Sequence, residues 1–330
     1  MYKFIVAIMV ILSGCNISNK SVEVNTSTGL SGIPQVVYFA SSETGYCFSN
    51  VRVWKEGKSQ PFENCSIFKT NDGGRSWIKI IEYLDTSFSS IHTFYGDCIY
   101  ILCKEKGGYR IVGFNYKHNK VVYKSSILPP ISCLWIKGEL LNYTTSRYPV
   151  SWYEMSLNLE NNRHLGEIDG YFLSCESYKD GSYGVLSNKG KNTIVFLSNN
   201  TDPRPIDIPN FNPLELKIEN DCIMIIGHDL INHKAMAVKY QIASGIYTTF
   251  AFDKFEIIDS LVGYDNKFFC LIGNTSGHLV KYQFAYYNNS LGNWQTIKLK
   301  NNTRCLPLAY IDGLCYLYGG PNSFQRIIIE

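Results

Sequence analysis

The residues whose types and spacing could do chemistry stand closest together in the octet TNDGGRSW at 70–77. A carboxylate, two glycines, an arginine and a tryptophan fall between the apolar runs CSIFK and IKIIEYL. An aspartate beside an arginine could bind a substrate or move a proton. The same aspartate in a glycine-rich hairpin could instead accept hydrogen bonds from backbone N–H groups. The strands around the octet therefore decide its role.

A second candidate is the segment GHDLINHK, in which Asp229 lies between His228 and His233. Two imidazoles and a carboxylate could bind a metal ion, but a solvated loop between strands is the simpler interpretation. The sequence has no GxSxG motif, P-loop or HExxH motif, and no Cys/His cluster with the spacing of a structural zinc site. We therefore expect no metal, no cofactor and no catalytic residues, and the protein is not expected to be an enzyme.

The composition indicates a packed globular body without a nucleic-acid-binding face. Hydrophobic residues make up 45% of the 330 residues and charged residues 18%, and the net charge of +3 comes from scattered lysines. Nucleic-acid binding needs a clustered basic surface, so nucleic acid is not expected as a partner. The 24 Tyr and 18 Phe favour β-strands.

A turn followed by an apolar strand recurs along the chain and predicts a repeat architecture. The interval between successive turns varies between 40 residues, from Gly181 to Asp221, and 51 residues, from Gly45 to Gly96. The seven turns lie at Gly45, Gly96, Gly138, Gly181, Asp221, Asp265 and Gly313. Each turn is preceded by one strand-like stretch and usually followed by three more.

Four short strands per repeat unit predict an all-β fold, a β-propeller with seven four-stranded blades over 33–330. The last unit, 304–330, has room for only three strands, and the segment SVEVNTS near the N-terminus could supply its outer strand. Six or eight blades, a β-sandwich or two smaller β domains are the alternatives. No Pro/Gly-rich linker divides the chain, which favours the single propeller.

In this repeat the octet falls between the third and fourth strands of the first unit. It matches the Asp-box pattern S/T-x-D-x-G-x-x-W at Thr70, Asp72, Gly74 and Trp77. The chain therefore resembles the Asp-box, or BNR-repeat, propellers, a group that includes sialidases and photosystem-assembly-type lipoproteins. The resemblance implies a structural role for the octet on the rim of the propeller. The segment NNSLGNW at 288–294 keeps the tryptophan but lacks the aspartate.

Sialidase activity is not expected, although the resemblance raises it. That chemistry needs three arginines that bind a carboxylate, a Tyr–Glu pair and an Asp. At 31–34 the sequence SGIP has Gly32 where the sialidase motif has arginine, and only eight arginines are present. The aromatic residues Trp54, Trp135, Trp152, Tyr286 and Tyr287 could stack on sugars or a partner protein, but packing within blades is the simpler interpretation.

The N-terminal sequence MYKFIVAIMVILSGC predicts an exported, lipid-anchored protein. Residues 1–14 have the short apolar run of a signal peptide. LSGC resembles the bacterial lipobox, in which the cysteine, here Cys15, carries the lipid. Residues 15–32 are polar and are interpreted as the lipidated Cys and a flexible tether. Asn16 is not the aspartate that signals inner-membrane retention in enterobacteria, which favours the outer membrane. An ordinary secretory signal is the alternative.

Ten cysteines remain after Cys15, and an even number in an exported chain permits disulfides. Several occupy equivalent strand positions in different repeat units, which indicates small apolar core residues. A bridge between adjacent strands, such as Cys305–Cys315, is the alternative. The ten are Cys47, Cys65, Cys98, Cys103, Cys133, Cys175, Cys222, Cys270, Cys305 and Cys315.

These features predict a membrane-anchored, non-enzymatic binding or scaffold propeller of the bacterial cell envelope, with a protein partner. One form of this function is an assembly scaffold, and another is an immunity protein that captures a toxin delivered into the periplasm. The alternative is a glycan-binding or degenerate sialidase-like propeller.

Overall fold

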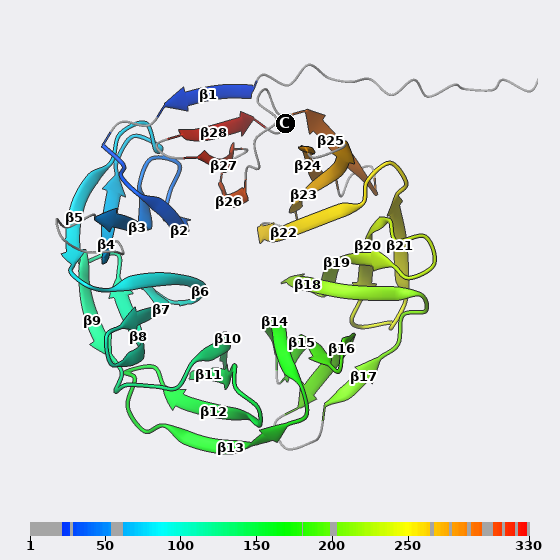
Figure 1. Cartoon of the computed structure of the whole chain (residues 1–330), viewed down its shortest axis with the longest axis horizontal. Helices are drawn as coiled ribbons and strands as arrows, with labels where there is room; N and C mark the ends of the chain where they lie inside the picture. Colours follow the sequence, from blue (N-terminus) through cyan, green and yellow to red (C-terminus); the bar gives the residue numbers. More distant parts are fainter. Residues whose placement is uncertain are drawn as a thin grey trace, which may run out of the picture.

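A computed structural model shows a ring of four-stranded antiparallel sheets (Figure 1). The structure describes residues 22–26, 29–53, 62–179, 181–198, 203–264, 267–276, 279–288, 292–298, 306–311, 314–320 and 323–328. Cys15 and the predicted signal peptide lie outside these residues. Among the described residues, no helix is long and apolar enough to cross a membrane.

Six blades each consist of four strands that are consecutive in the chain. Blade one contains β2 (Ile33–Phe39), β3 (Gly45–Val53), β4 (Phe62–Thr70) and β5 (Ile78–Tyr83). Blade two contains β6 (Ser87–Tyr95), β7 (Cys98–Glu105), β8 (Gly108–Asn115) and β9 (Lys120–Lys124). Blade three contains β10 (Ile131–Lys137), β11 (Leu140–Thr145), β12 (Val150–Ser156) and β13 (Arg163–Ile168).

Blade four contains β14 (Tyr171–Tyr178), β15 (Gly181–Asn188), β16 (Lys191–Ser198) and β17 (Arg204–Ile206). Blade five contains β18 (Phe211–Glu219), β19 (Cys222–Asp229), β20 (Ala235–Gln241) and β21 (Tyr247–Phe252). Blade six contains β22 (Ile257–Tyr264), β23 (Lys267–Ser276), β24 (Leu279–Asn288) and β25 (Asn293–Lys298).

The seventh sheet is composite. Its strand order is β1-β28-β27-β26, from β1 (Val22–Thr26), β26 (Leu306–Ile311), β27 (Leu314–Gly320) and β28 (Ser323–Ile328). β1 pairs antiparallel with β28, so a strand from the beginning of the chain completes the sheet at its end. This pairing closes the ring without an unpaired fourth strand in the last sheet.

The expectation of seven four-stranded blades is corrected by this arrangement. Six blades, not seven, are built from one repeat unit each, and the last unit supplies three strands only. The composite sheet agrees with the prediction that a segment near the N-terminus supplies the outer strand of the short last unit. β1 also lies within 15–32, so the described part of the predicted tether belongs to the fold.

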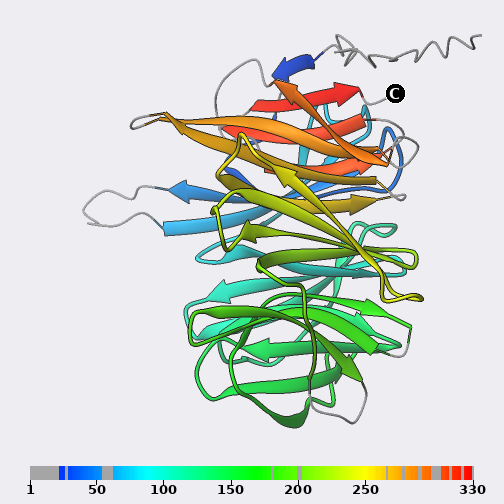
Figure 2. The same cartoon turned by 90° about the vertical axis from the view of Figure 1, so that its right-hand side faces the viewer.

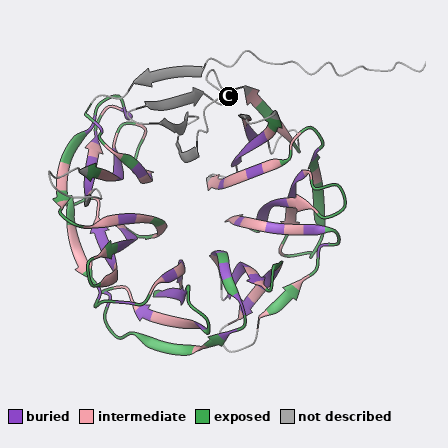
Figure 3. Ribbon diagram, viewed as in Figure 1, coloured by how far each residue is buried: buried purple, intermediate pink, exposed green. Residues whose placement is uncertain are grey.

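The core lies between the blades, where apolar faces of neighbouring sheets pack together. Phe48 and Ile67 of blade one and Ile99 and Phe114 of blade two are fully buried in one such cluster. An equivalent cluster joins blades five and six. The outermost strands are more exposed, as β13 shows (Figure 3). The middle strands are buried in continuous runs, as in β7 and β19, which reflects this packing on both faces.

The ring has two faces, seen edge-on in Figure 2. We call one the connector face; it carries the loops between second and third strands and the connections from blade to blade. Loops on this face form hydrogen bonds to one another. For example, Ser146 N in the β11–β12 loop donates to Pro130 O in the β9–β10 connection over 2.8 Å. The hairpin face carries the first-to-second and third-to-fourth turns, and there Gly73 N donates to Glu43 O over 2.8 Å. The octet at 70–77 belongs to the hairpin face.

The cysteines whose side chains are described are free thiols. They are Cys47, Cys65, Cys98, Cys103, Cys133, Cys175, Cys222 and Cys270. Six of them are buried, in keeping with the interpretation as small core residues. Cys305 and the side chain of Cys315 lie outside the described residues.

Candidate functional site

The octet lies between β4 and β5, the third and fourth strands of blade one, where the sequence predicted it. Asp72 Oδ1 accepts hydrogen bonds from Thr70 Oγ1 over 2.7 Å and from Ser76 N over 2.9 Å. Its Oδ2 accepts a bond from Ser76 Oγ over 2.5 Å. Partial burial opposes ionisation, but these bonds lower the pKa of Asp72 to about 2. The carboxylate is thus engaged inside its own hairpin.

The rest of the octet fixes the same turn. Gly73 and Gly74 have φ of 68° and 81°, a conformation that favours glycine. Gly74 N donates to Thr70 Oγ1 over 2.9 Å. Trp77 is buried; its indole N–H donates to Gly74 O over 3.1 Å, and its ring lies edge-on to Phe39 at 6.2 Å. The octet therefore holds a hairpin together and offers no free acid.

The sixth blade places Trp294 at the corresponding position, at the start of β25. Its ring packs edge-on against Phe252 at 5.5 Å and Tyr287 at 5.7 Å. The buried indole nitrogen has no hydrogen-bond partner in the described structure. Asn289, Ser290 and Leu291 lie outside the described residues. The tryptophan keeps its packing role where the aspartate is absent.

The histidine segment does not assemble a metal centre. His228 Nε2 lies 3.1 Å from Glu256 O, and Asp229 Oδ1 accepts a bond from Ile231 N over 2.7 Å. His233 occupies a turn position with φ of 56°. Across the described residues, no group of three or more His, Cys, Asp and Glu side chains is placed to hold a metal ion.

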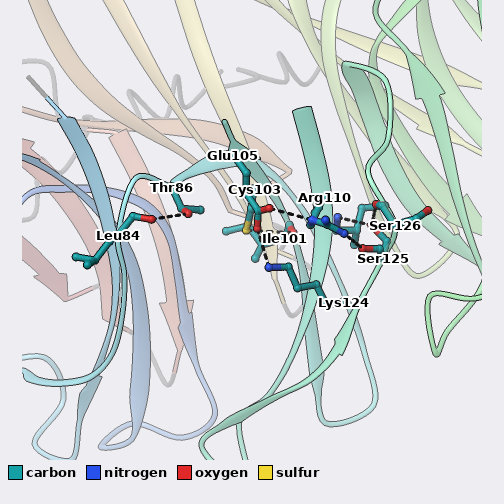
Figure 4. A network of polar contacts seen from close by, with 10 residues as sticks. Leu84, Thr86, Ile101, Cys103, Glu105, Arg110, Lys124, Ser125 and Ser126 are labelled. Atoms are coloured by element: carbon teal, nitrogen blue, oxygen red, sulfur yellow. Dashed lines mark hydrogen bonds and ion pairs between the residues drawn. The ribbon is translucent and has the colours of Figure 1, made fainter. Parts of the chain in front are cut away.

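Arg110 and Arg163 are engaged within separate blades. Arg110 Nε donates to Glu105 Oε2 over 2.9 Å and its Nη1 to Ser125 O over 2.6 Å (Figure 4). Lys124 also contacts Glu105, at 2.8 Å. Burial opposes ionisation of Glu105, yet Lys124 and Arg110 together lower its pKa. Arg163 pairs with Glu154 of its own blade. These contacts fix strands and do not form a carboxylate-binding cluster.

The inner strands of blades four to six carry charged residues that were not predicted from the sequence to form a site. The inner-strand charge cluster consists of Glu176 on β14, Glu215 and Lys217 on β18, and Asp259 on β22. Lys217 Nζ pairs with Glu176 across the interface of blades four and five. Glu215 Oε2 accepts a bond from Leu261 N over 2.9 Å, which joins blades five and six. The cluster thereby links three blades near the axis of the ring.

Lys217 and Glu215 of the inner-strand charge cluster have shifted pKa values. Burial would lower the pKa of Lys217, but the nearby carboxylates of Glu176 and Glu215 raise it. Burial raises the pKa of Glu215. On β6, burial lowers the pKa of His92 to about 4, so its imidazole is neutral near pH 7. The signal in the sequence was the charged residues in LELKI and SCESY, which interrupt apolar inner strands.

A pocket lies on the connector face between blades three and four. Its volume is about 360 Å³. Three loops meet there: the hairpin loops β11–β12 and β15–β16, and the connection β13–β14 from blade three to blade four. Tyr148 and Tyr171 line it, with side chains 80% and 47% exposed. Neither tyrosine stood out in the sequence, because their proximity depends on loops from two blades.

The aromatic residues that the sequence suggested as ligand-stacking candidates are mostly buried. Trp135 is 2% exposed, and its indole donates to Ser182 Oγ over 2.9 Å. Tyr286 and Tyr287 are buried. Trp152 is partly buried and donates to Asn142 Oδ1 over 3.1 Å. Trp54 lies outside the described residues.

The most exposed apolar side chains lie mainly on the connector face. Leu84, Ile127, Leu230 and Ile231 are 70%, 51%, 53% and 72% exposed, and Tyr148 is 80% exposed. On the hairpin face only Ile78 and Ile246, at 65% and 66%, exceed half exposure among the described residues. The side chains on the connector face come from loops of blades one, two, three and five, so they are distributed around that face.

Comparison with known proteins supports the fold class alone. No protein-family model matches the sequence, and no curated protein matches it. A chain of a mitotic checkpoint complex superposes with a TM-score of 0.63 at 8% identity over 100% of both chains. The β-propeller domain of Cps50 (Swd1) from Myceliophteria thermophila gives 0.60 at 8% identity, covering 91% of this chain and 98% of that one.

A catalytically inactive virginiamycin B lyase from Staphylococcus aureus, crystallised with quinupristin, gives a TM-score of 0.62 at 11% identity. The match covers 94% of this chain and 99% of the lyase. The chain is therefore a β-propeller. Its structural neighbours include an enzyme and a member of a multiprotein complex, so the fold alone does not select one activity.

Proposed function

We propose that the chain is a non-enzymatic β-propeller of the bacterial cell envelope that binds a protein partner through its connector face. The observation that carries this proposal is the excess of strongly exposed apolar side chains on that face. Five of the seven apolar side chains more than half exposed in the described structure lie on that face. A rigid ring with apolar loops on one side suits recognition of another protein.

The site chemistry favours binding over catalysis. Asp72, the acid of the octet, is tied into its hairpin. In the inner-strand charge cluster, Lys217 is paired with Glu176, and Glu215 accepts a backbone N–H. A general acid or base must contact its substrate and exchange a proton with it. These groups instead form hydrogen bonds and ion pairs within the protein.

The proposed location rests on the N-terminal sequence. A lipid on Cys15 would hold the propeller at the outer membrane, since two or more acyl chains anchor a protein stably. Labelling with radioactive palmitate should mark the full chain, and Cys15→Ser should abolish the label. Equal labelling of both proteins would refute the anchor.

The partner surface can be tested by affinity capture from envelope extracts, with Cys15 replaced for solubility. The connector variant combines Leu84→Ser, Ile127→Ser and Ile231→Ser, and the control variant combines Ile78→Ser and Ile246→Ser. We expect a discrete protein to be retained by the parent and the control variant, and to be lost from the connector variant. Equal retention by both variants would contradict the proposed surface.

The partner's identity would separate the two forms of the function. An immunity role predicts that the captured protein is a toxin, encoded by a gene adjacent to that of the propeller. A scaffold role predicts a secretion or assembly factor of the envelope.

A further inference from the structure

The pocket between blades three and four has the volume of a small-ligand site. Its volume of about 360 Å³ falls near the lower end of the range for such sites, roughly 300–1,000 Å³. Tyr171 begins β14 and pairs with Ser187 of β15, which fixes one wall. Tyr148 comes from the loop between β11 and β12 and also lines the pocket. Two blades therefore build the pocket together.

Two aromatic rings in the pocket lack partners in the protein. Neither Tyr148 nor Tyr171 makes a ring contact or a side-chain hydrogen bond with any described residue. Elsewhere in blade three, Tyr143 stacks on Tyr153 at 5.1 Å and donates to Asn162 Oδ1 over 3.0 Å. Exposed, unpartnered aromatic faces are suited to stacking on a ligand with an apolar face.

The polar groups beside the rings are held in place. Asp169 Oδ2 accepts a hydrogen bond from Asn188 Nδ2 over 2.9 Å, so the carboxylate is oriented while Oδ1 is left for a ligand. Gly170 has φ of 116°, and a Cβ there would lie 2.6 Å from Ser187 O. The connection and the hairpin are thus packed closely beneath the pocket. Lys189 adds an ammonium donor at its edge.

We propose that this pocket binds a saccharide, through stacking of a pyranose ring on Tyr148 or Tyr171 and hydrogen bonds from its hydroxyls to Asp169. A pyranose presents an apolar C–H face and hydroxyls that both donate and accept. The pocket offers the matching set: aromatic faces, a carboxylate acceptor and an ammonium donor. The carboxylate favours a neutral sugar over a uronic acid, because two carboxylates close together repel. The connector variant leaves the pocket residues unchanged, so capture of a protein partner and binding of a saccharide are tested separately.

The test is a glycan array of neutral hexosides, N-acetylhexosaminides and uronides, probed with the full chain carrying Cys15→Ser. Tyr148→Ala, Tyr171→Ala and Asp169→Asn alter the pocket at exposed positions, where folding is not at risk. Tyr247→Ala is the matched control, because Tyr247 is 39% exposed on the hairpin face. Unchanged thermal unfolding would confirm that each variant is folded.

We expect the parent and Tyr247→Ala to bind the same neutral glycans. Each pocket variant should weaken that binding by about tenfold or more, the change produced by losing a central contact. Three results would overturn the proposal: no glycan is bound, only uronides are bound, or the pocket variants bind as the control does.

Discussion

Asp72 and Ser76 are joined twice, by the Ser76 backbone N–H at 2.9 Å and by its hydroxyl at 2.5 Å. These two hydrogen bonds, between an acid and a serine four residues later, close the hairpin of the octet. The carboxylate of Asp72 accepts hydrogen bonds from the turn, the two glycines adopt its positive φ angles, and the buried ring of Trp77 packs over it. The relationship makes the octet a structural element of blade one and gives it a measurable contribution to stability.

Replacing Asp72 with alanine should destabilise the protein by about 1–3 kcal/mol, because a charged acceptor and its bonds to the turn are lost. Denaturant unfolding followed by tryptophan fluorescence would measure the change. Arg75→Ala is the control: Arg75 is exposed, and its substitution should change the free energy of unfolding by less than about 0.5 kcal/mol. Equal effects of the two substitutions would contradict the structural role.

The stability contributed by Asp72 should disappear in acid. Its pKa is about 2 in the folded protein and about 3.9 in an unfolded chain. Above both values the carboxylate is ionised in either state and its contribution is complete. As the pH falls from about 4 to about 2, the unfolded state takes up the proton first, so the free energy of unfolding decreases. Asp72→Asn should lack this component, and an identical pH profile for both proteins would rule it out.

The pair of Lys217 and Glu176 should contribute more than a surface ion pair. Both side chains are about one-third exposed, at 33% and 32%, and they join blades four and five. Glu176→Gln should cost about 1–3 kcal/mol, because Lys217 loses its partner in a partly buried setting. The matched control is Glu82→Gln, since the pair Lys79–Glu82 is more exposed, at 48% and 41%, and should contribute less than about 0.5 kcal/mol. Equal costs would contradict a linking role.

The buried thiols should resist alkylation until the propeller unfolds. Burial raises the pKa values of Cys47, Cys103, Cys175 and Cys270, and the thiolate is the reactive form. Treatment with N-ethylmaleimide at pH 8, followed by mass spectrometry of peptides, should leave these four unmodified in the native protein. All four should react in denaturant. Rapid native labelling, or disulfide-linked peptides among them, would disagree with the structure.

The periodic features of the chain were open to prediction from sequence. Gly96 and Gly138 have φ of 55° and 58°, and each marks a tight turn between the first two strands of its blade. The turn spacing thus gave the blade period, and the short last unit indicated the composite sheet closed by β1. These signals are local, since a turn and its two strands lie within one stretch of sequence.

The parts that could not be predicted depend on contacts between distant segments. Tyr148 and Tyr171 share a pocket because loops of two blades meet, and nothing in either segment alone shows their exposure. Trp135 was expected to pack within a blade and is buried, but the sequence does not show that its indole donates to Ser182 of the next blade. The pairing of Lys217 with Glu176 requires knowing which strands lie innermost.

The most direct test of the central claim is site-specific photocross-linking in living cells. The full chain would carry benzoylphenylalanine at Ile231 or at Ile246, which are 72% and 66% exposed on opposite faces. A binding propeller that works through its connector face predicts a discrete protein adduct from position 231 and none from position 246. No adduct at 231, or the same adduct from both positions, would contradict the account.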